Sequence, residues 1–237
     1  MKKIISILIA VTLIGTLTAC GSSSSGNADS ESQMAEENAV EEESASEQSN
    51  VGEGDTNSED TIEATGSILV AYFSLAGEQY EVGEITKGNT QVIAEMIAEE
   101  TGADLFSIDP VKEYSNDYNG KLDEATEEQQ NNERPEIASV VENFDDYDTI
   151  FIGYPIWWGD MPNIVYTFLE SYDFTGKTVI PFNTHAGSGQ AGTQSTIASM
   201  LNSATVLDGI AVRGKTAQED PDATRADVTG WLRQLGY

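Results

Sequence analysis

Residues suited to anion binding follow the first apolar run of the sequence. The run from Ile68 to Phe73 is followed by Ser74, and Gly88-Asn89-Thr90 directly precede a helical pattern. Hydroxyl groups and unpaired backbone amides at the start of a helix bind anions such as phosphate. These residues therefore predict an anion site at the first turn of that helix.

Two adjacent tryptophans stand in a second loop, residues 153–160 (Gly-Tyr-Pro-Ile-Trp-Trp-Gly-Asp). Neighbouring side chains of an extended loop point to opposite sides, so we expect at least one of Trp157 and Trp158 to face outward or to line a cleft. An indole offers a broad amphipathic surface on which a planar ligand can stack. The alternative is that both rings serve the core or an interface.

A third loop, residues 183–190 (Asn-Thr-His-Ala-Gly-Ser-Gly-Gln), combines the only histidine with two glycines. Gly187 and Gly189 leave backbone amides accessible, so this loop can close the other edge of a ligand site. His185 has no matching acid or nucleophile nearby in the sequence, which favours packing or hydrogen bonding over proton transfer. A single histidine also excludes a multi-histidine metal site, and we expect neither a catalytic residue nor a metal.

Short apolar runs alternate with helical patterns from residue 68 onward. Strands are expected at 68–73, 103–108, 149–153, 178–182 and 204–212, and helices near 89–100, 117–143, 162–170, 193–201 and 221–235. This alternation predicts an α/β domain with a parallel sheet covered by helices on both faces. Ligands bind such sheets beyond the carboxyl ends of the strands. The three loops follow the first, third and fourth strands, so they should meet at one site.

The first 19 residues have the features of an export signal peptide. Lys2 and Lys3 precede the apolar run from Ile4 to Leu17, which is shorter than the roughly 18 to 20 residues that cross a bilayer. The sequence Leu-Thr-Ala-Cys at 17–20 ends on the only cysteine of the chain and resembles the bacterial lipoprotein signal. That resemblance implies lipidation of Cys20 and cleavage before it. The alternative is a simple secretory signal with an incidental cysteine.

Residues 20–66 have the composition of a disordered tether. Positions 21–66 hold thirteen acidic residues and no lysine, arginine or aromatic residue, so they cannot bury enough apolar surface to fold. A specific acidic interaction tail is the alternative. The whole chain has a formal net charge of −30, which argues against a nucleic-acid partner. Residues 67–237 then form one domain by size.

The three loops resemble those of the flavodoxin family, in particular a branch found in secreted bacterial lipoproteins. The resemblance extends over residues 68–236 and rests on Ser74 with Gly88-Asn89-Thr90, on the Trp-Gly-Asp sequence at 158–160, and on the Thr-His-Ala-Gly-Ser-Gly sequence at 184–189. It implies a flavodoxin-like, doubly wound, five-stranded parallel sheet of strand order 2-1-3-4-5. It also implies FMN as the cofactor.

The resemblance assigns a part of FMN to each loop. The loop after the first strand would hold the phosphate through Ser74, Gly88, Asn89 and Thr90. The loop after the third strand would stack on the flavin ring through Pro155, Ile156, Trp157, Trp158 and Gly159. The loop after the fourth strand would enclose the pyrimidine side through Thr184, His185, Gly187, Ser188 and Gly189. In flavodoxins a peptide flips in the second loop, which here needs a positive φ at Gly159.

One departure from the family is an insertion of thirteen residues, 75–87, between Ser74 and Gly88. Either the insertion bulges outward and leaves the anion site intact, or Ser74 no longer reaches the phosphate. We expect the bulge, because Gly77 and Gly83 permit tight turns. The inserted segment would then shape access to the flavin or to a partner.

A second pattern, Gly209 to Thr216, fits the phosphate-loop motif G-x4-G-K-T of nucleoside triphosphatases. That motif needs a strand before its first glycine and a helix that starts at the lysine. Here residues 210–212 have the pattern of a strand, and the next helix signal is Asp220-Pro221. We therefore do not expect nucleoside triphosphatase activity.

These features together predict an exported FMN protein that acts in electron transfer. Cys20 would anchor it by lipid to the outer face of the bacterial cytoplasmic membrane. The acidic surface would dock on a redox partner protein with a basic surface. Whether the protein is a carrier or an enzyme stays open at this point. The alternatives are an FMN-dependent NAD(P)H or quinone oxidoreductase and a non-redox ligand-binding lipoprotein.

Overall fold

A parallel sheet of six strands forms the centre of the computed structural model, which describes residues 67–237. The strands are β1 (Ser67–Tyr72), β4 (Asp104–Ser107), β5 (Tyr147–Pro155), β6 (Thr178–His185), β7 (Thr205–Val206) and β8 (Ile210–Arg213). Their order is β4-β1-β5-β6, with both β7 and β8 paired to β6. The predicted order 2-1-3-4-5 is confirmed. The expected export signal, Cys20 and the acidic tether lie outside the described residues.

The fifth strand of the predicted order is split in two. β7 pairs with Thr178 and Val179, and β8 pairs with the last four residues of β6. Pro181 lies between the two pairings, and proline cannot donate a hydrogen bond to a neighbouring strand. Gly209 passes close to it, since a Cβ on Gly209 would lie 2.2 Å from the Pro181 carbonyl oxygen. The single strand expected at 204–212 is therefore wrong, because no strand joins β7 to β8.

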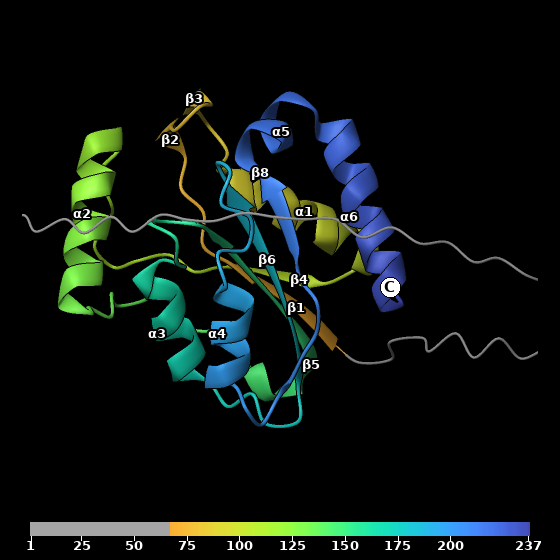
Figure 1. Cartoon of the computed structure of the whole chain (residues 1–237). Coiled ribbons are helices and arrows are strands. Elements are labelled where there is room, and N and C mark those ends of the chain that lie inside the picture. The colour runs from red at the N-terminus through yellow and green to blue at the C-terminus, as the bar shows by residue number, and fades with distance from the viewer. Residues whose placement is uncertain (1–66) are drawn as a thin grey trace, which may run out of the picture. The chain divides into compact units, whose positions relative to one another are not determined.

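Helices cover both faces of the sheet (Figure 1). One face carries α1 (Asn89–Thr101), α5 (Gly214–Glu219) and α6 (Pro221–Leu235), and the other carries α3 (Asn163–Ser171) and α4 (Thr193–Met200). The sheet serves both cores because successive side chains of a strand alternate in direction. In β1, Val70 packs with the α1 and α6 side chains, whereas Leu69 and Ala71 pack with those of α3.

The helix α2 (Tyr118–Asn131) stands beside the sheet and is mostly polar, with only Lys121 and Ala125 buried. The helical pattern expected over 117–143 is wrong beyond residue 131. Asn132 adopts a left-handed conformation (φ 51°) that ends the helix, and Pro135 follows. The next helical residues form a short 3-10 turn, Phe144–Asp146. The short helix α5 also lies where no helix was expected.

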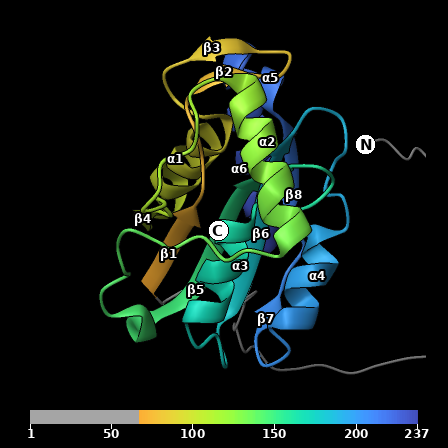
Figure 2. The same cartoon turned by 90° about the vertical axis from the view of Figure 1, so that its left-hand side faces the viewer.

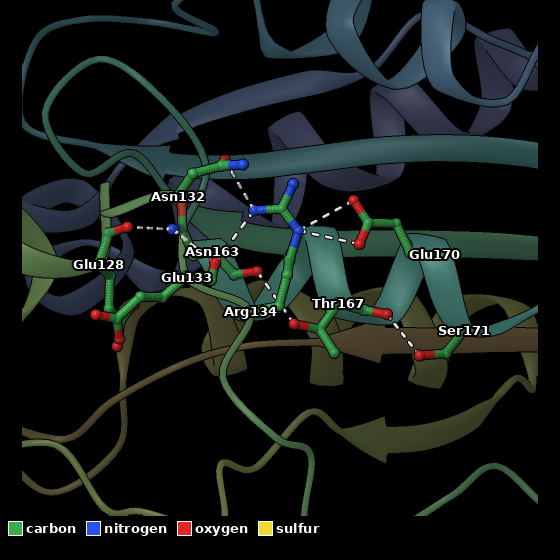
Figure 3. Close-up of polar contacts among 8 residues, drawn as sticks. All are labelled: Glu128, Asn132, Glu133, Arg134, Asn163, Thr167, Glu170 and Ser171. Carbon is green, nitrogen blue, oxygen red and sulfur yellow. Dashed lines mark hydrogen bonds and ion pairs between the residues drawn. The ribbon is translucent and has the colours of Figure 1, made fainter. Parts of the chain in front are cut away.

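Polar contacts hold the carboxyl end of α2 against α3 (Figure 3). The buried Asn163 side chain donates from Nδ2 to the carbonyl oxygens of Glu128 (2.7 Å) and Glu133 (2.9 Å). Arg134 donates from Nε to both carboxylate oxygens of Glu170, at 3.0 Å each. Since α2 has little apolar surface to bury, these contacts fix its position relative to the sheet.

The inserted residues 75–87 form a two-stranded antiparallel hairpin of β2 (Gly77–Gln79) and β3 (Gly83–Ile85). It lies above the amino end of α2 (Figure 2). Lys121 of α2 donates from Nζ to the carbonyl oxygens of Ala76 (2.9 Å) and Glu78 (3.0 Å). The rings of Tyr80 and Tyr118 stack with centroids 6.2 Å apart. The insertion thus bulges outward as expected and docks on α2.

Within residues 67–237, every helix is too short or too polar to cross a membrane.

Candidate functional site

A pocket of about 230 Å³ opens at the carboxyl ends of the strands. Its wall includes nine of the residues singled out in the sequence: Ser74, Asn89, Thr90, Pro155, Ile156, Trp157, Trp158, Thr184 and His185. The structure therefore brings together the three loops that follow β1, β5 and β6. The rest of the wall comes from the inserted segment 75–87, from α2, from Ala186, and from Arg213 at the end of β8 with the start of α5.

The anion end of the pocket is the first turn of α1. Gly88 precedes the helix and has no side chain to cap it, and the Ser74 Oγ accepts a hydrogen bond from the Gln91 amide at 3.0 Å. A Cβ on Gly88 would lie 2.2 Å from that Oγ, so only glycine allows this approach. The insertion has thus left Ser74 beside Gly88. The hydroxyl of Thr90 lies next to that of Thr184 at the end of β6.

The two tryptophans have different surroundings. Trp157 packs edge-on against Phe73 and Tyr114, with ring centroids 5.4 Å apart in both pairs. Trp158 is 61% exposed and lines the pocket. The expectation that at least one indole lines a cleft is confirmed, and Trp157 also packs against the core.

Residues 157–160 form a tight turn with a left-handed backbone. Backbone hydrogen bonds join Trp157 and Asp160 in both directions, at 2.8 and 3.0 Å. Both central residues have positive φ, 51° at Trp158 and 79° at Gly159, as in a type I′ turn. A positive φ is unusual for a residue with a Cβ. The expected positive φ at Gly159 is present, and Trp158 also has a positive φ.

The imidazole of His185, the last residue of β6, is hydrogen bonded to the loop that follows. Burial and then the charge of Arg213 lower the pKa of His185 below its ordinary value. Its Nδ1 accepts a hydrogen bond from the Gly187 amide at 2.9 Å. Accepting there requires that any ring proton sit on Nε2. His185 can therefore donate one hydrogen bond at the pocket edge.

Five of the six predicted glycine and serine positions do not line the pocket, and Ser74 is the exception. Gly88 packs on Ser74, and Gly159 forms the turn. Gly187 contacts His185, and the Gly189 carbonyl accepts from the Asn183 side chain at 3.0 Å. Ser188 is an exposed residue of the same loop. The four glycines have no side chain, so their contribution to a site is to set loop conformation.

The pocket also has residues that the sequence interpretation missed. Lys121 is 7% exposed, and its burial lowers the pKa of its ammonium group, against the effect of Glu84, Glu78 and Asp117. The hairpin adds Tyr80, and the start of α5 adds Lys215. A lone lysine in the acidic pattern of α2 was the available signal for Lys121, and the G-x4-G-K-T pattern pointed to Lys215.

The arrangement suits a planar ligand with an anionic tail. The cradle made by Gly88 and Ser74 offers backbone amides and hydroxyls, which are donors that an anion requires. The exposed indole of Trp158 offers a face for stacking.

Comparison with known proteins gives a consistent set of similarities. The family model described as Flavodoxin matches residues 67–233. A crystal structure from Bacteroides eggerthii, of a protein classed as a flavoprotein, is 31% identical with a TM-score of 0.58, covering 72% of this chain and 98% of its own. A similar protein from Bacteroides uniformis is 31% identical with a TM-score of 0.58, covering 71% and 98%. A Lactobacillus acidophilus flavoprotein in complex with FMN is 24% identical with a TM-score of 0.51, covering 65% and 97%. No curated protein matches the sequence.

Proposed function

The chain belongs to the flavodoxin family, and we propose that its folded domain binds FMN and acts in electron transfer. One observation carries the proposal: a single pocket combines the first turn of α1 with the exposed indole of Trp158. The first turn of α1 suits a phosphate, and the indole of Trp158 suits the isoalloxazine ring. The Lactobacillus relative that contains FMN has the same fold.

The proposed roles follow the geometry of the pocket. Ser74, Asn89 and Thr90 would hold the phosphate, because they surround the first turn of α1. Trp158 would orient the ring by stacking, and His185 would hydrogen bond to its edge. Bound FMN supplies the one-electron and two-electron chemistry. The chain itself binds, orients and shields the cofactor, and no side chain is assigned an acid or base role.

An absorption spectrum tests the cofactor. The purified full chain should be yellow with flavin absorption, or the apoprotein should bind FMN on titration and bleach with dithionite. A colourless protein that cannot be reconstituted with FMN would favour the alternative of a non-redox ligand-binding lipoprotein. Consumption of NAD(P)H or a quinone by the loaded protein would make it an FMN-dependent oxidoreductase rather than a carrier.

The proposal includes a lipid anchor on Cys20 and a place on the outer face of the bacterial cytoplasmic membrane. Its support is the lipoprotein-like sequence Leu-Thr-Ala-Cys at 17–20 and the single cysteine of the chain. Cys20→Ser should release the protein from membranes. Unchanged processing and membrane fractionation of the variant would refute the lipid anchor.

The proposal also includes a redox partner protein with a basic docking surface. Residues 67–237 contain 28 acidic and nine basic residues, and a surface of one sign attracts a partner of the other. Electron transfer to such a partner should slow as salt concentration rises. A rate that does not depend on salt would remove this part of the proposal.

A further inference from the structure

The segment 209–216 reaches the pocket in a conformation unlike a phosphate loop. β8 occupies residues 210–213, between the two glycines of the G-x4-G-K-T pattern, and α5 begins at Gly214. A phosphate loop instead needs the strand before its first glycine, so that the intervening backbone amides surround the phosphate. The backbone here therefore cannot cradle a nucleoside triphosphate. What the segment does is bring Lys215 to the wall of the pocket.

Close packing fixes the start of α5 against the first turn of α1. A Cβ on Gly214 would lie 2.5 Å from the Asn89 Nδ2, so glycine permits the approach. Gln218 donates from Nε2 to the Asn89 Oδ1 (3.0 Å) and to the Lys87 carbonyl oxygen (2.8 Å). Lys215, the neighbour of Gly214, is thereby held at the end of the pocket where Asn89 begins α1.

Among the three cations that line the pocket, Lys215 has the loosest contact within the described part of the chain. Arg213 donates to the Ala186 carbonyl (3.2 Å) and to Glu81 (3.4 Å). Lys121 donates to two carbonyls of the hairpin at 2.9 and 3.0 Å. Lys215 has an ion pair with Glu219 at 3.8 Å, and its side chain is 50% exposed. Its ammonium group can therefore turn toward a ligand at little cost.

We propose that Lys215 is a specificity-determining residue that pairs with the phosphate of FMN, an inference that rests on the proposed function. Residues 67–237 carry an excess of acidic groups, and their field opposes the binding of a phosphate dianion. A nearby ammonium group offsets that repulsion and adds a charge-assisted hydrogen bond. Riboflavin has the same ring without the phosphate, so Lys215 should not contribute to its binding.

The test compares FMN and riboflavin on the full chain. Dissociation constants of both flavins are measured by fluorescence quenching for the wild type, Lys215→Gln and Lys215→Arg, at low and high salt. Lys112→Gln is the matched control, because Lys112 is also an exposed lysine with a loose ion pair, to Glu124 at 3.7 Å. It lines a different cleft, so the variant makes the same change in net charge away from the pocket.

Lys215→Gln should weaken FMN binding about tenfold at low salt and riboflavin binding less than about twofold. Lys215→Arg should keep most of the FMN affinity. Lys112→Gln should change the affinity for neither flavin by more than about twofold. The loss in Lys215→Gln should shrink at high salt, because exposed charges are screened. An unchanged ratio of FMN to riboflavin affinity in Lys215→Gln would overturn the role of Lys215 while FMN binding by the wild type stands. A wild type that binds no FMN would overturn the proposed function itself.

Discussion

The hydroxyl oxygens of Thr90 and Thr184 lie 2.8 Å apart, although 94 positions separate the two residues in the sequence. Thr90 belongs to the first turn of α1, and Thr184 to the end of β6. Both side chains are buried. One hydroxyl donates to the other, so the pair has one hydrogen left for a further acceptor. Both residues line the pocket, so a bound phosphate can be that acceptor.

Thr90→Val should weaken FMN binding by about tenfold or more, because a hydrogen bond to a charged group is lost. Riboflavin affinity should change by less than about threefold, since this ligand has no phosphate to meet the hydroxyl. Thr90→Ser keeps the hydroxyl and should keep FMN affinity. Titrations that show equal losses for the two flavins in Thr90→Val would place the phosphate elsewhere.

Alanine variants of the two tryptophans should have different effects, one on flavin binding and the other on stability. Trp158→Ala should weaken FMN and riboflavin alike by about tenfold and leave the melting temperature nearly unchanged, since this exposed ring stacks on no described core residue. Trp157→Ala should lower the unfolding free energy by about 2 to 4 kcal/mol, because Trp157 packs on Phe73 and Tyr114. Flavin titration and thermal denaturation of both variants measure the two effects. A large loss of stability in Trp158→Ala would contradict the assignment.

The topology could be predicted because the sequence signals it locally. The apolar runs of β1, β5 and β6 are bounded by loops of polar and glycine residues, and the predicted strand order agrees with the structure. The details that were missed depend on contacts between distant residues. The break between β7 and β8 faces Pro181, which belongs to another strand. The end of α2 is an exception, because the left-handed conformation of Asn132 and the following Pro135 stop the helix locally.

In the site, too, locally signalled features could be predicted and contacts between distant residues could not. The three loops that the sequence predicted do meet, since they follow parallel strands that end at one edge of the sheet. The inserted segment was expected to shape access to the flavin, but its docking on α2 was not predicted, because no local pattern says that Lys121 will reach the carbonyl of Ala76, 45 residues away. Nor does the sequence indicate that Gly214 approaches Asn89 closely enough to bring Lys215 to the pocket.

Gly159→Ala should lower the unfolding free energy by about 1 to 2 kcal/mol, because a residue with a Cβ is strained at its φ of 79°. Crowding is not the cause, since a Cβ there meets no atom of the described chain within 4 Å. Gly230→Ala in α6 is the control: its Cβ would be equally uncrowded among the described residues, but its backbone is helical. That change should stabilise by about 0.5 to 1 kcal/mol. Urea denaturation measures the unfolding free energy of both variants. If Gly159→Ala and Gly230→Ala changed it equally, the turn at 157–160 would have another conformation in solution.

Glu128→Gln should stabilise the domain more at pH 7 than at pH 4. Burial raises the pKa of Glu128, as do Glu133 and Glu124 nearby, although the Tyr114 hydroxyl bond lowers it. With its pKa raised, the folded state holds the proton to higher pH than the unfolded chain, so stability falls as pH rises through that window. The variant should melt about 1 to 3 °C higher than the wild type at pH 7. Glu127→Gln, an exposed neighbour on the same helix, is the control, and an equal gain from it would point to net charge as the cause.

Lys121→Met should loosen the hairpin and speed the release of FMN. The ammonium group of Lys121 joins α2 to the carbonyls of Ala76 and Glu78, and methionine retains the apolar stem but not these hydrogen bonds. Losing them leaves two carbonyls short of a donor, at a cost of about 1 to 3 kcal/mol each if they stay buried. The hairpin can instead move out to water, which opens one wall of the pocket. Amide hydrogen exchange at residues 77–85 should therefore accelerate about tenfold.

A matched control separates this local opening from a general loss of stability. Lys177 is also buried, at 9% exposure, and donates to the carbonyls of Asp145 (3.1 Å) and Tyr147 (2.5 Å). Asp145 lies in the 3-10 turn and Tyr147 at the start of β5, and neither they nor Lys177 line the pocket. Lys177→Met should therefore destabilise the domain to a similar extent and leave both the hairpin exchange and the FMN dissociation rate unchanged. If Lys121→Met lowers the melting temperature but exchange at residues 77–85 stays at the wild-type rate, then the lysine is a core residue only, and Tyr80 stacked on Tyr118 is enough to hold the hairpin over the pocket.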